Sequence, residues 1–335
     1  MNICLIGNFS GNPDEGMKVV ARCLAQKLAK THDVLKLDIY KAIRPSVWHG
    51  MLRFNPNVLH YISGPSPFSF MMLRVLLLGC KVRPSGYVKT VMTATQPWLP
   101  LNSVSFCRKL KPDLLLTQSR QTEKYFKHVG FFVRNLPNGV DTDRFKPVTE
   151  SGKSELRAKY GLSDSDFIVL HVGPVRMNRG LDVLKPVAQM KHCRVLVAGS
   201  TTSPLEEPMF LDLVKSGCVV WREYIKRIHE VYQLSDLYVF PVEDRLGSID
   251  IPLSVLEAMA CNLPVITTRF GGFPRLFTKG DGFFFVNHRH KIPEVVEDLR
   301  SRGISHDVRT RSKVMPFSWE NIAKTLIRYY MELLD

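Results

Sequence analysis

The sequence lacks most of the short motifs that mark one particular chemistry. Its seven cysteines are scattered without a CxxC pair, and its ten histidines do not have the spacing of metal ligands. There is no GxxxxGK phosphate loop, no HExxH helix, no Ser-His-Asp nucleophile elbow and no GxGxxG fingerprint. These absences argue against a P-loop NTPase, a zinc peptidase, a serine hydrolase and a nicotinamide-dependent enzyme.

Long hydrophobic runs are also missing. The longest apolar stretch, residues 68–80 (FSFMMLRVLLLGC), is interrupted by Arg74 and falls short of the ~18 apolar residues that span a bilayer. We expect it to form a helix that either packs in a core or lies on a membrane. The start, MNICLIGNFSG, has neither the basic nor the apolar region of a signal peptide, so with reduced cysteines we expect a cytoplasmic location.

Acidic residues are few in the first part of the chain. The formal net charge is +15, of which residues 1–150 carry +12 and residues 151–335 carry +3. No block of five or six like charges occurs, so a disordered tail that binds nucleic acid is not indicated. The basic first half is instead typical of a surface that meets anionic lipid headgroups or an anionic substrate.

What the sequence does contain is a regular alternation of apolar strands and amphipathic helices. A strand at 2–6 leads through a polar loop, 7–15, into a helix that begins at Gly16. Turn residues cluster at 136–147, and the alternation then restarts. The pattern predicts two α/β domains, each a doubly wound parallel sheet covered on both faces. The strands expected are residues 2–6, 34–37, 58–62, 87–95, 114–117, 167–173, 194–199, 218–221, 237–241 and 264–268.

The sequence offers two candidate phosphate contacts. One lies in the first half of the chain, and the other follows the first strand of the second half. Gly16 stands where a loop meets a helix, and there it is either an ordinary turn glycine or a close backbone approach to an anion. In HVGPVRMNRGL (171–181), Arg176 and Arg179 follow a strand end. They are either solvated loop arginines or clamps for a diphosphate.

The most informative stretch is PLSVLEAMACNLPVITTRFGG, residues 252–272. It places a helix N-terminus and a carboxylate, Glu257, after an expected strand, where α/β proteins bind ligands. Because the helix is otherwise apolar, Glu257 needs a hydrogen-bond partner, which is either a neighbouring loop or a pair of ribose hydroxyls. Asp250 either caps this helix or contacts a sugar hydroxyl.

Four segments together resemble the retaining glycosyltransferases of family 4. They are NGVDTDRFKP at 138–147, VGPVRMNRGLDVL at 172–184, EAMACNLPVITTRFGG at 257–272 and FSWENIAKTLIRYY at 317–330. The resemblance implies the GT-B fold, in which two doubly wound, Rossmann-like domains face each other across a cleft. It implies an acceptor-side domain at 1–148, onto which the helix at 318–335 packs, and a donor domain at 149–317.

The resemblance also assigns roles to individual residues. Glu257 matches the acid that holds the nucleotide ribose, and Arg179 matches the basic residue before glycine that binds the donor diphosphate. Gly16 matches the loop glycine that faces the donor phosphates. The helix that opens at Ser254 would present backbone N–H groups to the same diphosphate.

Three departures from the family pattern concern the sugar. Pro174 stands where the family usually has arginine, and Arg176 is our expected replacement. The first acid of the E-x7-E pattern falls on Ile249, so we take Asp250 as its substitute. The first-domain histidine near the sugar falls on Gln96. We therefore expect Arg176, Arg179, Asp250 and Gln96 to be catalytic, and Gly16, Arg179, Ser254 and Glu257 to bind the donor.

From these residues and this resemblance we expect a metal-independent glycosyltransferase of the hexosyltransferase type. It would need no cofactor beyond its nucleotide-diphosphate sugar, and it would act on a lipid-linked or polysaccharide acceptor, peripheral to the inner face of an anionic membrane. Nucleic acid is not an expected partner. The alternatives are a non-catalytic protein that binds nucleotide sugars and a nucleotide-sugar epimerase of the GT-B fold.

Overall fold

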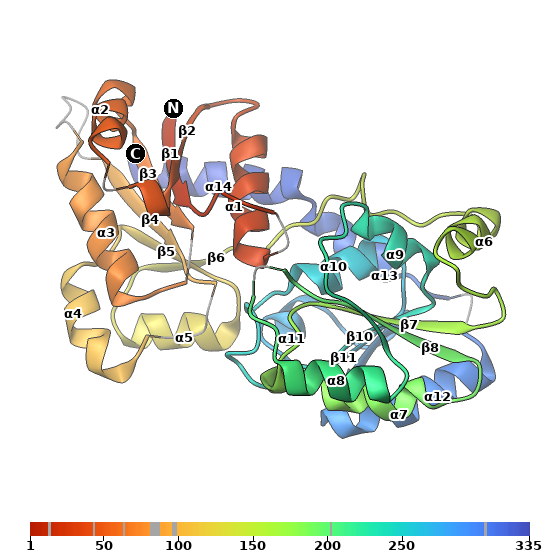
Figure 1. The fold of residues 1–335 in the computed structure, drawn as a ribbon. Helices are drawn as coiled ribbons and strands as arrows, with labels where there is room; N and C mark the ends of the chain where they lie inside the picture. Colours follow the sequence, from red (N-terminus) through yellow and green to blue (C-terminus); the bar gives the residue numbers. More distant parts are fainter. Residues whose placement is uncertain are drawn as a thin grey trace. The chain divides into compact units, whose positions relative to one another are not determined.

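The chain divides into two compact units, each built on its own parallel sheet (Figure 1). The computed structural model describes residues 1–12, 15–42, 44–62, 64–80, 88–95, 99–201, 203–304 and 307–335. The first unit comprises Met1–Gly139, Ile249–Ile251 and Trp319–Asp335, and the second comprises Val140–Ser248 and Pro252–Ser318. The chain therefore passes between the units four times. Gln96 lies outside the described residues.

The sheet of the first unit has six strands in the order β2-β1-β3-β4-β5-β6, and all its pairs are parallel. Its central strands are continuous apolar runs, as expected of a sheet that is buried on both faces. Ile3, Leu5 and Leu115, for example, have no exposed surface. The strands are β1 (Asn2–Gly7), β2 (Asp33–Asp38), β3 (Val58–Ile62), β4 (Lys89–Thr93), β5 (Leu114–Thr117) and β6 (Val133–Asn135).

Helices cover both faces of this sheet. Figure 1 shows α1 and α14 on one face, and α2, α3 and α4 on the other. In α3, Ser66 and Ser69 form a capping box that fixes the start of the helix. Its inner side is buried, whereas Phe68 and Leu78 are 51% and 85% exposed. The helices of this unit are α1 (Gly16–Leu28), α2 (Pro45–Phe54), α3 (Pro67–Leu78), α4 (Val104–Lys109), α5 (Arg120–His128) and α14 (Trp319–Leu334).

The last helix, α14, is part of the first unit. Its buried residues recur at helical spacing, which gives it one apolar face. The Tyr330 hydroxyl on that face lies 2.6 Å from Nδ1 of His60 in β3. Nε2 of the same ring lies 2.7 Å from the Thr93 hydroxyl in β4. A side chain on Gly139 would lie 2.6 Å from the Trp319 ring, so the glycine allows the helix to pack this closely.

The sheet of the second unit also has six parallel strands, in the order β12-β11-β10-β7-β8-β9. The first strand in sequence, β7, therefore lies between β10 and β8, and the strand order reverses beside it. The strands are β7 (Phe167–Val172), β8 (Cys193–Ala198), β9 (Val219–Trp221), β10 (Leu237–Phe240), β11 (Val265–Thr268) and β12 (Phe283–Val286).

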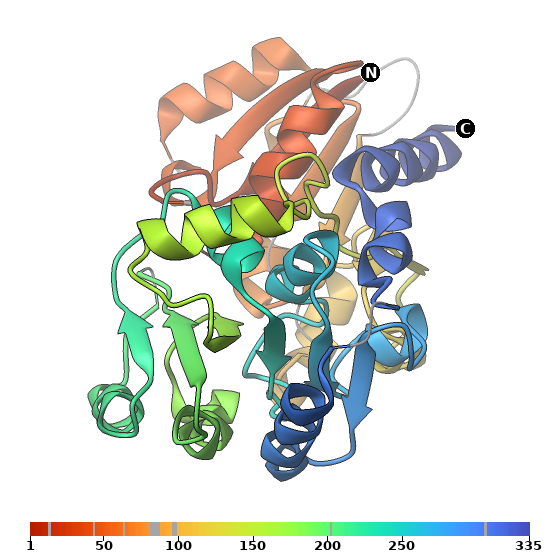
Figure 2. The ribbon, with the colours of Figure 1, turned by 90° about the vertical axis from the view of Figure 1, so that its right-hand side faces the viewer.

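Helices cover both faces of the second sheet as well. Figures 1 and 2 show α7, α8 and α12 on one side of its strands, and α9, α10 and α13 on the other. The helices are α6 (Glu150–Lys159), α7 (Leu184–Ala188), α8 (Glu207–Lys215), α9 (Ile228–Leu234), α10 (Leu253–Ala260), α11 (Phe273–Leu276), α12 (Ile292–Arg302) and α13 (Thr310–Val314).

The predicted architecture of two doubly wound parallel sheets is confirmed. Each of the ten predicted strands overlaps an observed one, although residue 87 of the strand predicted at 87–95 lies outside the described residues. Two edge strands, β6 and β12, were not predicted. The loop residues Ile249–Ile251, which we assigned to the donor domain, belong to the first unit.

Candidate functional site

The second sheet brings its candidate phosphate-binding residues to the carboxyl ends of two neighbouring strands. Strands β7 and β10 are parallel neighbours, with Leu170 opposite Tyr238. The chain leaves β7 toward Arg176 and Arg179, and it leaves β10 toward the start of α10. Because the strand order reverses between β10, β7 and β8, these strand ends lie at the topological switch point at which open α/β sheets bind ligands.

Arg179 is the central cation of this site. Its side chain is only 4% exposed. Nη1 donates a hydrogen bond to the Gly247 carbonyl at 2.7 Å, and the guanidinium lies 5.5 Å from the centroid of the Phe240 ring. Nε has no partner in the described part of the chain. Burial lowers the pKa of Arg179 to about 10, with a smaller contribution from the charge of Arg176 and against the opposing effect of Tyr238, so the side chain is still charged at neutral pH.

Two glycines make room for arginine side chains, Gly173 for Arg179 and Gly180 for Arg289. Gly173 has φ +152°, and a side chain on it would lie 2.5 Å from Nη2 of Arg179. Gly180 has the left-handed φ of +67°, and a side chain there would meet Arg289 at 2.6 Å. Arg289 in turn pairs with Glu243 at 2.9 Å. The close packing of Arg289 against the loop therefore requires glycine at the position after Arg179.

Arg176 adds a second positive charge. It is partly exposed, and its Nε approaches the Pro204 carbonyl at 3.4 Å. Neither Arg176 nor Arg179 forms an ion pair with a carboxylate in the described part of the chain. An unpaired buried cation carries a desolvation cost, which a bound anion would offset. The pair of arginines is thus suited to a phosphate or diphosphate group.

The N-terminus of α10 follows β10, the parallel neighbour of β7, and it has no acidic residue in its first turn. Its N-cap is Pro252, which makes no side-chain capping bond, and a capping role for Asp250 stays a prediction. The Ser254 hydroxyl hydrogen-bonds to the hydroxyl of Tyr238, which donates to the Val172 carbonyl at 3.3 Å. This chain of bonds ties the start of α10 to the carboxyl end of β7.

Glu257 lies one turn further along α10 and is partly buried. Its Oε2 accepts a hydrogen bond from the hydroxyl of Tyr232 at 2.8 Å. Burial raises the pKa of Glu257 to about 7, against the opposing effects of the Tyr232 bond and the charge of Arg144. Oε1 makes no hydrogen bond within the described residues, which leaves one carboxylate oxygen available to a ligand.

His171 packs beneath the site as a neutral side chain. It is fully buried, and its Nδ1 lies 2.9 Å from the Val239 carbonyl. Burial, with a smaller contribution from the charge of Arg179, lowers the pKa of this histidine to about 3. Nε2 has no partner in the described part of the chain. One nitrogen of His171 and one of Arg179 are thus buried without a hydrogen-bond partner, as expected of a region that a ligand completes.

Two predicted site residues, Gly16 and Asp250, lie in the first unit. A side chain on Gly16 would meet Ile249 at 3.0 Å, so that face of the glycine is covered. The Asp250 carboxylate accepts a hydrogen bond from the Thr122 hydroxyl, in the first turn of α5, and its backbone N–H donates to the Thr95 carbonyl at 3.0 Å. Asp250 is 5% exposed, and its role as a catalytic acid stays a prediction.

The residues that position Arg179 and Glu257 were not foreseen. Tyr232, Phe240 and the Gly247 carbonyl contact them from segments that are distant in sequence.

Across the described residues no group of three or more His, Cys, Asp or Glu side chains gathers as a metal site would require. In the same ranges, no helix combines the length and apolar character needed to cross a membrane.

Residues 166–301, which include Arg179 and Glu257, match the model of the family described as Glycosyl transferases group 1. The predicted family resemblance is thereby confirmed. Among curated proteins, the chain is 26% identical over 298 residues to sulfoquinovosyl transferase SQD2 of Arabidopsis thaliana, covering 82% of this chain and 55% of that protein.

A second relative is the GDP-mannose-dependent monoacylated alpha-(1-6)-phosphatidylinositol monomannoside mannosyltransferase of Corynebacterium glutamicum, 28% identical over 188 residues. The match covers 51% of this chain and 48% of that protein. The chain thus spans about half the length of these curated relatives. Among solved structures, Anabaena Alr3699/HepE in complex with UDP superposes with a TM-score of 0.78 at 13% identity, covering 99% of this chain and 100% of that one. The two Rossmann-like units are those of the GT-B fold.

Proposed function

We propose that this protein is a retaining glycosyltransferase that moves a sugar from a nucleotide-diphosphate donor to a lipid-linked or polysaccharide acceptor. The observation that carries the proposal is Arg179, a buried, charged guanidinium without a carboxylate partner, at the switch point of the second sheet. A diphosphate supplies the missing negative charge. The family of residues 166–301 supplies the reaction class.

The donor would bind to the second unit through separate contacts for its phosphates and its ribose. Arg179, Arg176 and the uncapped N-terminus of α10 are suited to the diphosphate, since guanidinium forks and helix N-termini both favour phosphate oxygens. Oε1 of Glu257 is available to accept hydrogen bonds from ribose hydroxyls, while Tyr232 holds Oε2. Support for the donor class comes from the Anabaena protein of the same fold, whose structure was solved with UDP.

In the proposed reaction the bond between the anomeric carbon and the diphosphate breaks, and a bond to the acceptor oxygen forms on the same face of the sugar. Arg179 and Arg176 would stabilise the charge that develops on the leaving diphosphate. The acceptor proton passes to an oxygen of that leaving group. This electrostatic role is one that a metal ion fills in other enzymes, so we propose a metal-independent reaction of the hexosyltransferase type. The catalytic roles predicted for Asp250 and Gln96 stay predictions.

A lipid acceptor is supported by the relative from Corynebacterium, whose name specifies a phosphatidylinositol monomannoside. The first unit also combines apolar and basic surface. Besides Phe68 and Leu78, Met71 of α3 is 43% exposed and Phe106 of α4 is 46% exposed. We propose that this unit attaches to the anionic inner face of a membrane. Co-sedimentation with liposomes should increase with their content of anionic lipid, and a lack of such dependence would refute the attachment.

The direct test of the donor site is a thermal-shift screen with UDP-, GDP- and ADP-sugars. A donor at ~100 times its dissociation constant should add about 2.7 kcal/mol of stability. Glu257→Ala should lose most of that gain, and an unchanged gain would refute the ribose assignment. Product analysis with and without acceptor then separates the alternatives. An epimerase converts the donor alone, whereas a non-catalytic binding protein leaves the donor intact in both.

A further inference from the structure

A pocket of about 430 Å³ lies at the edge of the second sheet, formed entirely by residues of the second unit. Arg269 and Asn287, which line it, directly follow the paired strands β11 and β12, so the pocket opens where these parallel strands end. Its volume lies within the range of small-molecule sites. It shares no lining residue with the proposed donor site, whose residues follow β7 and β10.

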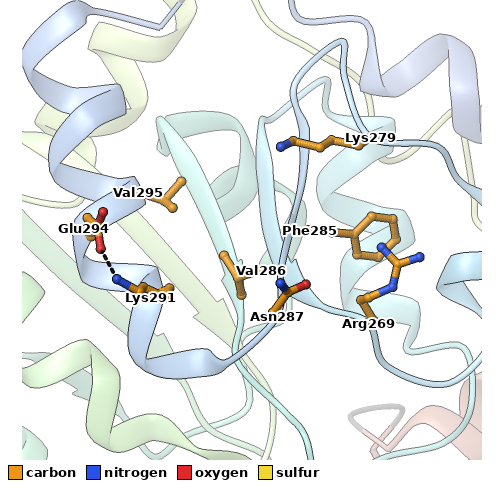
Figure 3. A pocket seen from close by; sticks show the side chains of 8 residues that line it. All are labelled: Arg269, Lys279, Phe285, Val286, Asn287, Lys291, Glu294 and Val295. Carbon is orange, nitrogen blue, oxygen red and sulfur yellow. Dashed lines mark hydrogen bonds and ion pairs between the residues drawn. The ribbon is translucent and has the colours of Figure 1, made fainter.

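The pocket has an apolar floor and a basic rim. Val286 and Val295 supply the apolar floor, and Figure 3 shows them on one side of the view, with the Phe285 ring on the other side beside Arg269. The remaining charged side chains that line the pocket are Lys279, Lys291 and Glu294. Three cations thus face one carboxylate.

The three cations are not equivalent. Nζ of Lys291 lies 2.8 Å from Oε2 of Glu294, so this lysine is already neutralised. Arg269 and Lys279 have no carboxylate partner within the described ranges. The Arg269 guanidinium lies 5.1 Å from the centroid of the Phe285 ring, a cation–π contact that fixes its position and leaves its N–H edge free. Two cations without a carboxylate partner beside an apolar floor favour a ligand that has an anionic group and an apolar group.

We propose that this pocket binds a small phosphate monoester with a flat apolar group. The phosphate would lie between Arg269, which matches phosphate oxygens in a fork, and Lys279, which contributes a point charge. The apolar group would lie against Val286 and Val295. The pocket is a second ligand site of the protein, and its existence does not depend on the proposed donor function.

The test is calorimetric titration of the full chain with phenyl phosphate, which combines both halves of the proposed ligand. We expect saturable binding of one equivalent, and weaker binding of both inorganic phosphate and phenol. The double variant Arg269→Gln/Lys279→Gln should bind at least about tenfold more weakly, since each lost charge-assisted bond is worth roughly 1.5 kcal/mol or more. The double variant Lys291→Gln/Glu294→Gln is the matched control and should bind as the unchanged protein does, because it removes an ion pair and leaves the net charge of the pocket unchanged.

Three results would overturn the proposal. One is the absence of binding, and another is equal binding by the double variant when its melting temperature is unchanged. The third is displacement of phenyl phosphate by UDP together with its loss in Glu257→Ala, which would place the ligand in the donor site. Failure of the donor function itself would leave phenyl phosphate binding and its dependence on Arg269 unchanged, so the two proposals fail separately.

Discussion

Each unit buries one histidine on an interior strand of its sheet, and the two histidines differ in what their nitrogens contact. His60 in β3 and His171 in β7 both have no exposed surface, and burial lowers the pKa of each to about 3. Both nitrogens of His60 are hydrogen-bonded, to Tyr330 and Thr93. His171 is bonded only through Nδ1, and its neighbour Arg179 also keeps an unpartnered nitrogen.

The difference separates a structural polar cluster from a ligand site. In the first unit every member of the His60 cluster is neutral and has a partner, so the cluster stabilises the packing of α14 on the sheet. In the second unit a charged guanidinium is buried beside an incompletely bonded imidazole, which costs stability unless a ligand completes the arrangement. Substitutions in the His60 cluster should therefore lower mainly stability, whereas substitution of Arg179 should lower mainly activity.

The largest effect is expected from Arg179→Met, which keeps the length of the side chain and removes its charge. Glycosyl transfer should fall about 10²- to 10³-fold, as for the loss of one transition-state donor. The free energy of unfolding without donor should stay the same or rise by about 1 kcal/mol, because a buried unpaired charge is removed. Steady-state kinetics and urea unfolding measure the two quantities. Arg176→Met, at a more exposed position, is the matched control for stability alone, because Arg176 is also a proposed diphosphate ligand. A clear loss of stability in Arg179→Met would contradict this account.

An intermediate effect is expected from His60→Leu. The substitution leaves the hydroxyls of Tyr330 and Thr93 buried without their partner, and it should lower the free energy of unfolding by about 2–4 kcal/mol. His171→Leu breaks one bond and should cost about 1 kcal/mol. Urea unfolding at pH 7 measures both, and equal losses would remove the distinction between the two clusters.

The same two histidines should make the protein sensitive to acid. Their folded-state pKa values lie below the ordinary value, so each must stay neutral in the fold while the unfolded chain takes up a proton below about pH 6.5. Stability should therefore decrease as the pH falls from about 6.5 toward 3. Stability curves of His60→Leu and His171→Leu should each be flatter over this interval, and an unchanged slope in both variants would show that other groups cause the loss.

The smallest effect is expected from Tyr232→Phe, which removes the hydrogen bond to Glu257. The bond opposes the burial that raises the pKa of Glu257 to about 7, so its loss should raise that pKa further. Because the carboxylate is the form that would accept bonds from ribose in the proposed donor site, donor binding should decrease as the pH falls through about 7. The variant should lose this binding at a higher pH, with affinity reduced about fivefold at pH 7. A titration series from pH 6 to 9 tests the shift, and parallel curves would show that Tyr232 only fills space.

The two sheets could be predicted from the sequence because their central strands are continuous apolar runs bounded by turn residues. The two edge strands that were missed are less regular. β6 consists of only Val133, Arg134 and Asn135, and β12 is a phenylalanine run between Gly282 and Asn287 whose pairing depends on β11. Edge strands have one neighbour and partial exposure, so their sequences carry a weaker signal.

The site was partly predictable for a similar reason. Arg179 and Glu257 stand in local patterns, one after a strand glycine and the other in an apolar helix, so sequence alone identified them as candidates. Their partners are set by the fold, since Tyr232 and Glu257 are 25 positions apart. Asp250 shows the limit most clearly, because its hydrogen bond to Thr122 joins residues separated by 128 positions.

The attachment of α14 to the first sheet has a consequence for the order of folding during synthesis. The ribosome makes His60 early, but the tyrosine that completes its hydrogen bonds is residue 330, so nearly the whole chain must emerge before the face that α1 covers in part is fully covered. Until then that face exposes apolar surface, the condition that favours aggregation and recruits chaperones. The unit that begins first is therefore finished last, and a truncation that removes α14 should damage the first unit rather than the second, although the cut lies directly after the second unit in the sequence.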